Sequence, residues 1–292
     1  MKKIRFSSIV IYGILFIITL TMLIPILNLV AISLTNPSNV HKMNGLSIIP
    51  KGFSMINYKV LLSNPQIGKS ILNSIFITVV GTSLNLIFTA LAAYTLTRPK
   101  FVGKNFFMIL LIIIMVFEPG LIQEYLVVMK LGLLDSYASV ILYKCVNVYY
   151  LIILMRFFED VPDSILEAAR VDGAGHFTIF TKIMLPLSKP ALATLGLFYG
   201  VFHWNEFFRS SIYLSSQWKW PLQLVLRQFV VVKDTTSMLG VNSLLSYSEI
   251  SNLDYGSLQA GTIIIAIIPL LALYPIILKY YVKGNLEGGV KE

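Results

Sequence analysis

Few residue patterns in this sequence could do chemistry. Gly68-Lys69-Ser70 resembles the end of a phosphate-binding loop, but the first glycine of that motif would fall at Ser63, and no apolar strand precedes it. The three histidines are far apart and have no carboxylate at a metal-ligand spacing; they are His41, His176 and His203. We therefore expect no nucleotide, metal ion or other cofactor to bind to this chain.

The sequence also lacks the residues of an intramembrane enzyme. No serine-nucleophile motif and no glutamate pair stands in an apolar segment, so a nucleophile and a base are missing. The single cysteine, Cys145, excludes a disulfide framework and any multi-cysteine metal site.

Seven polar side chains interrupt the apolar segments. Placing a polar side chain in lipid costs free energy, so a polar residue within an apolar segment suggests a functional role. These side chains either line a solute pathway or form hydrogen bonds between helices. The seven are Asn73, Asn85, Glu118, Lys144, Asn147, Asn205 and Glu206.

The composition places these side chains in a membrane protein. Of 292 residues, 56% are hydrophobic and 13% are charged, against about 45–50% and 25% in soluble domains. The mean hydropathy is +0.77. The high hydrophobic content and the low charged content exclude intrinsic disorder, a collagen-like fibre and a soluble α/β enzyme. The net charge of +9 then reports the orientation in the membrane and not a nucleic-acid partner.

Six segments have the length of about 20 apolar residues that a membrane span needs. They lie near residues 8–33, 71–96, 105–128, 137–157, 190–210 and 258–281. The first apolar run is too long for a cleaved signal peptide, so we expect an uncleaved span. Glu118-Pro119-Gly120 interrupts the third, which is either one kinked span or a span that ends near Phe117 and is followed by a short helix.

The distribution of basic residues orients these spans. With the N-terminus inside, the inner segments hold 13 Lys and Arg in 63 positions, and the outer segments hold 9 in 109. Basic residues concentrate on the cytoplasmic side. We therefore expect both termini in the cytoplasm, and the loop 160–189 as the longest cytoplasmic loop.

The loop 160–189 predicts two helices joined by a turn. Ser164 and Glu167 have the spacing of a capping box at the start of the first helix, and Gly173 and Gly175 would end it. The second helix would place Phe177, Phe180 and Met184 on one face and stop at Pro186. Such a loop either docks into a groove on another protein or merely connects two spans.

The residues of this loop resemble the EAA loop of bacterial ABC-importer permeases. The matching positions are Glu167-Ala168-Ala169, Asp172-Gly173-Ala174, Phe180, Ile183, Leu185-Pro186 and Pro190. Further segments are similar to the carbohydrate-uptake, maltose-type branch: Gly132-Leu133-Leu134-Asp135-Ser136, Trp204-Asn205-Glu206-Phe207 and Val282-Lys283-Gly284. The tail 286–292 resembles permeases of aldouronate, alginate and complex-polysaccharide oligosaccharide systems.

This resemblance implies a fold and a function. The fold is all-α: one transmembrane domain over residues 1–292, with six spans and a cytoplasmic coupling helix, the type I ABC-importer permease architecture. The function is to form, with a second homologous permease, the pathway for an oligosaccharide, including an acidic, uronate-containing one. The expected location is the inner membrane of a bacterial cell.

The resemblance also implies partners and residue roles. An ATPase dimer would bind ATP and Mg²⁺, and an extracellular solute-binding protein would deliver the sugar. Glu167 would hold the shape of the loop, Gly173 would permit its sharp turn, and the motif as a whole would couple the chain to the ATPase. The contact surface would consist of Ala168, Ala169 and Ala174, with Asp172 beside it.

Besides the intramembrane enzyme, one alternative comes from another functional class. A stand-alone secondary transporter or channel would carry internal repeats and acidic residues within the spans, and the sequence has no clear repeat.

Three smaller features of the sequence also carry predictions. Gly196 and Gly200 allow close helix packing, either within the chain or with the second permease. Glu206 and Arg209 are three positions apart, which permits a local ion pair, and Tyr94 is expected at a membrane interface.

Overall fold

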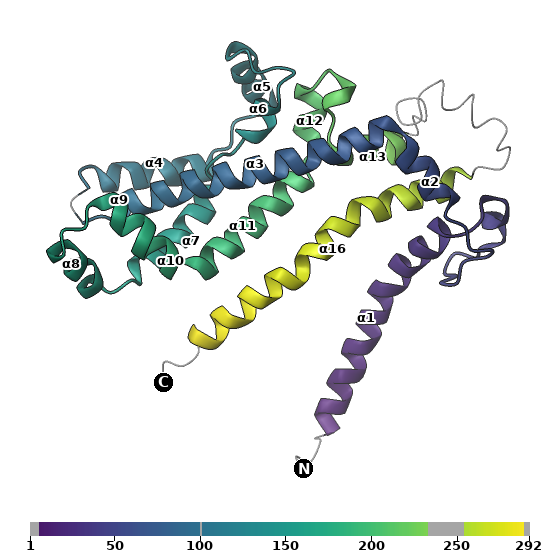
Figure 1. Cartoon of the computed structure of the whole chain (residues 1–292), viewed down its shortest axis with the longest axis horizontal. Coiled ribbons are helices and arrows are strands. Elements are labelled where there is room, and N and C mark those ends of the chain that lie inside the picture. Colours follow the sequence, from purple (N-terminus) through teal and green to yellow (C-terminus); the bar gives the residue numbers. More distant parts are fainter. Residues whose placement is uncertain (1–5, 100, 233–253, 289–292) are drawn as a thin grey trace. The chain divides into compact units, whose positions relative to one another are not determined.

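Helices dominate the computed structural model of the chain, which describes residues 6–99, 101–232 and 254–288 (Figure 1). Within these ranges one isolated bridge, between Thr35 and Phe53, is the sole β-type pairing. The sequence predicts an all-α fold, and the structure confirms it. The helical elements are α1 (Phe6–Ser33), η1 (Pro37–Lys42), α2 (Ile56–Ser63), α3 (Pro65–Leu96), α4 (Lys104–Val116), α5 (Leu121–Lys130), α6 (Tyr137–Ile141), α7 (Val148–Glu159), α8 (Asp163–Val171), α9 (His176–Ile179), η2 (Phe180–Met184), α10 (Leu185–Leu187), α11 (Lys189–Trp204), α12 (Phe208–Tyr213), η3 (Gln217–Lys219), α13 (Leu222–Arg227), η4 (Gln228–Val232) and α16 (Tyr255–Gly288).

The described helices include fewer clear spans than the predicted six. Three are long and apolar enough to cross a membrane: Val10–Ser33, Pro65–Leu96 and Tyr255–Ala272. The number rises to five if each of two bent helix pairs forms one span. One pair is α4 and α5, which meet at 117°, and the other is the α9–α10 segment and α11, which meet at 80°. The six-span count is therefore not confirmed.

The predicted span at 137–157 is not one continuous helix. It is split into α6 and α7 by residues 142–147, and Lys144 at the break has a φ of +47°. A left-handed residue cannot continue a right-handed helix. The 12 residues of α7 extend about 18 Å, short of the roughly 30 Å of a bilayer core.

At Glu118-Pro119-Gly120 the structure breaks the helix. α4 ends at Val116, Phe117 follows as its C-terminal cap, and α5 begins separately at Leu121. The α5 helix ends in a Schellman turn at Gly132, whose φ is +67°. The helix end near Phe117 and the short helix after it are therefore as predicted, while the number of spans that α4 and α5 form stays a prediction.

The chain divides into two units, which we describe separately. The first contains residues 1–69 and 225–269. Its centre is the fully buried Asn57 of α2, whose side-chain amide donates to the carbonyl oxygens of Ser33 (2.9 Å) and Thr35 (3.3 Å). Ser257 of α16 donates to the Asn57 Oδ1 atom at 3.1 Å. One buried amide thus joins the end of α1, α2 and the start of α16.

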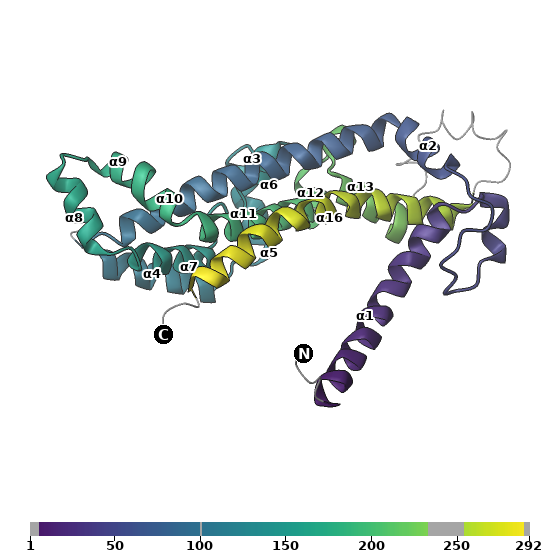
Figure 2. The ribbon, with the colours of Figure 1, turned by 60° about the horizontal axis from the view of Figure 1, so that its bottom comes forward.

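The second unit contains residues 70–224 and 270–292. Its core gathers buried apolar side chains from α3, α7, α8, η2 and α11, and α7 packs against both α4 and α11. Both views of the ribbon place α8 at one end of this unit, beyond the ends of α3 and α7 (Figures 1 and 2). The far end carries α12 and the start of α13, whose Leu222 is buried.

Small residues let α3 and α11 approach each other within this unit. A Cβ atom on Gly196 would lie 3.3 Å from Leu86, and one on Gly200 would lie 3.7 Å from Thr82. The structure therefore supports within-chain packing for this glycine pair. On α3, Gly81 faces the ring of the buried His203, whose Nε2 atom lies 3.2 Å from Asn85 Oδ1.

We predict that Gly81→Ala destabilises the chain by about 1–3 kcal/mol, the usual cost of overpacking. The new Cβ atom would lie 2.5–2.7 Å from three atoms of the His203 ring. The matched control is Gly200→Ala, which meets only an ordinary contact and gains helix propensity. Thermal unfolding in detergent measures the difference, and equal midpoints for the two variants would contradict the packing described here.

Candidate functional site

The first helix of the predicted coupling loop is α8, but it does not start with the predicted capping box. Pro162 is the N-terminal cap residue, and no side chain caps this end. The backbone N–H of Ile165 bonds to the Pro162 carbonyl at 3.1 Å, which places Ser164 inside the first turn. The fixed φ of proline starts the helix earlier than the Ser164–Glu167 pattern predicts.

The other end of α8 is a Schellman turn. Gly173 has a φ of +81°, its N–H bonds to the Arg170 carbonyl at 3.0 Å, and the Ala174 N–H bonds to the Ala169 carbonyl at 2.9 Å. A glycine is favoured at this left-handed position because it has no Cβ atom. The predicted turn at Gly173 is confirmed.

The outer face of α8 is exposed and carries acidic, small and large apolar side chains. Glu167, Ala168, Asp172 and Gly173 are exposed, while Ala169 and Ala174 are partly buried. Large apolar side chains stand beside these small residues; they are Ile165, Val171, which is 88% exposed, and Phe177, which is 76% exposed.

The Glu167 carboxylate is exposed, and the described part of the chain offers it no hydrogen-bond or ion-pair partner. Its expected role in holding the loop's shape is therefore not visible as a contact within the chain. The shape is held by buried apolar side chains instead. Leu166 is 4% exposed, and it joins Ile179, Phe180 and Met184 in the core formed with α3, α7 and α11.

The predicted aromatic face of the second helix is only partly correct. Phe180 and Met184 are buried, but Phe177 points away from the core. The second helix consists of the four-residue α9 and the π-helical turn η2, whose i→i+5 bonding departs from the regular α-helical repeat that the prediction assumed. Pro186 lies inside α10, and α11 begins with Lys189 and Pro190.

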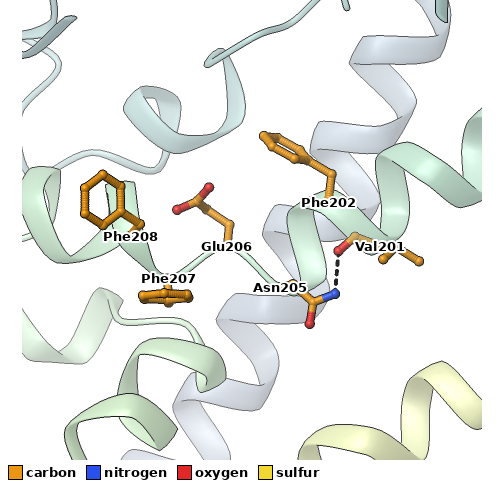
Figure 3. A pocket seen from close by; sticks show the side chains of 6 residues that line it. All are labelled: Val201, Phe202, Asn205, Glu206, Phe207 and Phe208. Atoms are coloured by element: carbon orange, nitrogen blue, oxygen red, sulfur yellow. Dashed lines mark hydrogen bonds between the residues drawn. The ribbon is translucent and has the colours of Figure 1, made fainter. Parts of the chain in front are cut away.

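A pocket of about 310 Å³ lies at the break between α11 and α12 (Figure 3). Asn205 caps the end of α11, and its Nδ2 atom donates to the Val201 carbonyl at 2.9 Å. Glu206 is buried, and its Oε1 atom accepts the Arg209 backbone N–H at 2.7 Å. Aromatic rings and two polar side chains thus share one cavity, which is lined by Val201, Phe202, Asn205, Glu206, Phe207 and Phe208.

The other five pathway candidates are placed differently. The Asn73 amide is buried; it donates to the carbonyls of Trp218 (2.8 Å) and Trp220 (3.1 Å) and accepts from Tyr137 (2.9 Å). Asn85 lies between His203 and the Lys144 carbonyl, which is 3.4 Å away. Asn73 and Asn85 thus form hydrogen bonds between segments, which is one of the two roles that the sequence allowed. Their other possible role, lining the solute pathway, stays a prediction.

The remaining three stand at helix breaks. Asn147 caps α7 by accepting the N–H groups of Tyr149 (3.0 Å) and Tyr150 (3.3 Å). Glu118 and Lys144 form an exposed ion pair at 2.5 Å. Of the seven candidates, the pocket brings together only Asn205 and Glu206.

Arg209 does not form the local ion pair that its spacing from Glu206 permits. Its guanidinium pairs with Glu124 of α5, with a shortest distance of 3.6 Å, and lies 3.7 Å from the centre of the Tyr143 ring. Tyr143 also donates to Glu124 at 3.3 Å. This cluster connects α5 and α12 to the break after α6, and sequence spacing could not reveal it because its members are far apart in the chain.

Asp135 is a second structural site that the sequence indicated only as part of a motif. It has a φ of +53°, and its carboxylate accepts the Ser216 N–H (3.0 Å), the Ser216 hydroxyl (2.6 Å) and the Lys219 ammonium (2.8 Å). The hydrogen bond from Lys219, followed by those from Ser216, lowers the pKa of Asp135 well below its usual range. These bonds fix the segment 214–220 to the loop before α6.

We predict that Asp135→Asn lowers thermal stability at neutral pH, because an amide cannot pair with Lys219. A depressed carboxyl pKa contributes stability above the unfolded value of about 3.9, and this stability is lost as the pH falls further. The difference in midpoint between the wild type and the variant should be constant from pH 5 to 7 and should shrink below pH 4. A difference that does not change with pH would contradict the ionic role of Asp135.

Comparisons with known proteins identify the family. Residues 70–284 match the family described as binding-protein-dependent transport system inner membrane component. The chain belongs to this family. The polygalacturonan/rhamnogalacturonan transport system permease protein YtcP of Bacillus subtilis is 38% identical over 99% of each chain. The arabinooligosaccharides transport system permease protein AraQ of Halalkalibacterium halodurans is 31% identical over 91% of this chain and 90% of its own.

A solved structure supports the fold of this permease family. It is a crystal structure of a bacterial ABC transporter involved in the import of the acidic polysaccharide alginate, and one of its chains superposes with a TM-score of 0.87. That chain is 30% identical, and the match covers 96% of this chain and 98% of the other. The resemblance to ABC-importer permeases is thus confirmed, and the family is one of transport components and not of enzymes.

Proposed function

We propose that this chain is the membrane-spanning permease subunit of an ATP-driven ABC importer for an oligosaccharide. The single observation that carries the proposal is α8: a short, exposed helix whose inner side chains are buried in the core of the spans. A helix held this way can receive force on its outer face and pass it to the helices behind it.

The partner of α8 is an ATPase subunit. The small residues of the EAA motif allow a close approach, and the exposed Ile165, Val171 and Phe177 supply apolar contact. Two ATPase subunits bind ATP and Mg²⁺ and perform the hydrolysis, and this chain does no chemistry. The loop 160–189 and both chain termini lie on the cytoplasmic side, in agreement with the excess of Lys and Arg there.

The cargo is an acidic oligosaccharide. Relatives named for polygalacturonan and alginate import support this class. The outer segment 34–70 supports it too, since its four lysines are exposed and the segment holds no acidic residue; they are Lys42, Lys51, Lys59 and Lys69. Long-range attraction would raise the local concentration of an anionic sugar or attract an acidic surface on the solute-binding protein.

The pocket at the α11–α12 break suits a sugar that passes through. Rings of Phe202, Phe207 and Phe208 offer apolar faces for pyranose C–H groups, and Asn205 and Glu206 offer hydrogen bonds for hydroxyls. A second homologous permease completes the pathway on the other side, and an extracellular solute-binding protein delivers the cargo.

The proposal is tested by reconstitution. The chain is combined in vesicles with the homologous permease, the ATPase and the solute-binding protein, and uptake is measured with a uronate oligosaccharide and with a neutral one of equal length. We expect ATP-dependent uptake that favours the acidic sugar. Transport by the chain alone would contradict the proposal and would favour a secondary transporter.

A second test targets the coupling turn. Gly173→Ala forces a side chain into a left-handed conformation at a cost of about 1–2 kcal/mol, so we expect less sugar transported per ATP hydrolysed. The matched control is Gly175→Ala, since Gly175 has a φ of −72° and a Cβ atom added there would meet no atom within 4 Å. Full uptake by the Gly173 variant would contradict the coupling role.

A further inference from the structure

Tyr94 joins the end of α3 to the coupling loop. The residue is 8% exposed and lies in the core that also contains Leu166 and Phe180. Its hydroxyl oxygen lies 3.2 Å from the Nδ1 atom of His176 and 3.2 Å from the His176 carbonyl oxygen. His176 is the first residue of α9, directly after the turn that ends α8.

Both polar contacts are satisfied by one arrangement of protons. The Tyr94 hydroxyl donates to the carbonyl, and the Nδ1–H of a neutral His176 donates to the hydroxyl oxygen. The ring of Tyr94 is held at the same time, because it packs on Phe180 at 5.2 Å between centroids and lies 4.4 Å from the Arg98 guanidinium. The Arg98 Nε atom donates back to the Tyr94 carbonyl at 3.1 Å.

Helix α3 also forms hydrogen bonds with other segments at several positions. Thr89 shares a 2.8 Å hydrogen bond with Tyr199 of α11, and Tyr199 also accepts the N–H of Asn147 at 3.1 Å. Near the other end, Asn73 holds the carbonyls of Trp218 and Trp220, and Ser74 accepts the Leu222 N–H at 2.8 Å. Asn73 and Tyr94 are 21 positions apart, about 32 Å along an α-helix.

We propose that Tyr94 is a positioning residue that transmits movement of the coupling loop to α3. Through α3, that movement reaches the segment 218–222 on the opposite side of the membrane. The inference rests on the proposed function, since it assumes that an ATPase moves α8. It adds that the loop acts on a helix distant in sequence, besides α7 and α11, which are its direct chain neighbours.

The hydroxyl of Tyr94 is the specific part of this link. Phe180, Leu166 and the other apolar neighbours would pack as well against a phenylalanine. Packing alone lets one surface slide on another, whereas the two bonds to His176 fix the start of α9 to one point of α3. The loss of the hydroxyl should therefore change coupling more than it changes stability.

The test uses the whole importer with Tyr94→Phe. We expect the sugar transported per ATP hydrolysed, and the stimulation of ATPase activity by the loaded solute-binding protein, to fall about two- to tenfold, in line with the strength of one or two hydrogen bonds. The amount of assembled complex should not change. The matched control is Tyr149→Phe, because Tyr149 is 61% exposed and its hydroxyl lies outside this network.

A second variant keeps the test independent of folding in the core. His176→Ala changes an exposed side chain and should lower the same two quantities in the same direction. His176→Ala removes only the bond to the ring and keeps the one to the backbone carbonyl, so its loss should be smaller than that of Tyr94→Phe. Combined with Tyr94→Phe, it should add little further loss, because Tyr94→Phe already removes both bonds. Unchanged transport per ATP in Tyr94→Phe, or a loss explained entirely by less assembled complex, would overturn the proposal.

The wild-type importer separates this outcome from failure of the proposed function. If the wild type couples ATP hydrolysis to uptake and Tyr94→Phe does so equally well, only the role of Tyr94 is refuted. If the wild-type chain assembles with no ATPase, the proposed function itself fails.

Discussion

The structure depends on one constraint: in a membrane, every backbone N–H and carbonyl group released by a helix break must find a partner within the protein. Several breaks in the second unit have a side-chain partner. Asn147 caps α7, Ser136 caps α6 with its side chain, and Glu206 accepts an N–H at the start of α12. Asn85 reaches the carbonyl of Lys144, the left-handed residue in the break before α7. Polar side chains in the apolar segments are thus tied to helix breaks.

This constraint explains why the pocket and the structural sites use similar residues. A break exposes polar backbone and brings in amides and carboxylates to satisfy it, and those groups are also the ones that a sugar hydroxyl recognises. At the α11–α12 break, Asn205 remains exposed and its Nδ2 atom is bonded within its own helix. At Asn73 the whole amide is used by the segment 218–220 and by Tyr137. Burial distinguishes the two cases, because the Asn73 side chain is buried, whereas Asn205 is exposed and its Oδ1 atom accepts only a long bond of 3.5 Å from Gln223.

The sequence predicts the features that depend on neighbouring residues. The turn at Gly173, the end of α4 near Phe117 and the helical class all follow from local rules, and the structure confirms them. The sequence does not predict features that depend on contacts between residues far apart in the chain. The split between α6 and α7 involves a bond from Asn85, 59 positions away, and the partner of Arg209 is Glu124 and not the nearby Glu206. Ser164 is a different failure, because Pro162 overrides a valid local pattern.

Two helix breaks come together at Glu118 and Lys144, which places a full positive and a full negative charge at the surface beside the short helix α7. Charges that are this exposed retain their hydration shells. Ionisable side chains within membrane-spanning regions almost always face a water-filled cavity or the interior of a helix bundle. The side of the chain that carries this pair is therefore suited to face water or another subunit, and not the lipid tails.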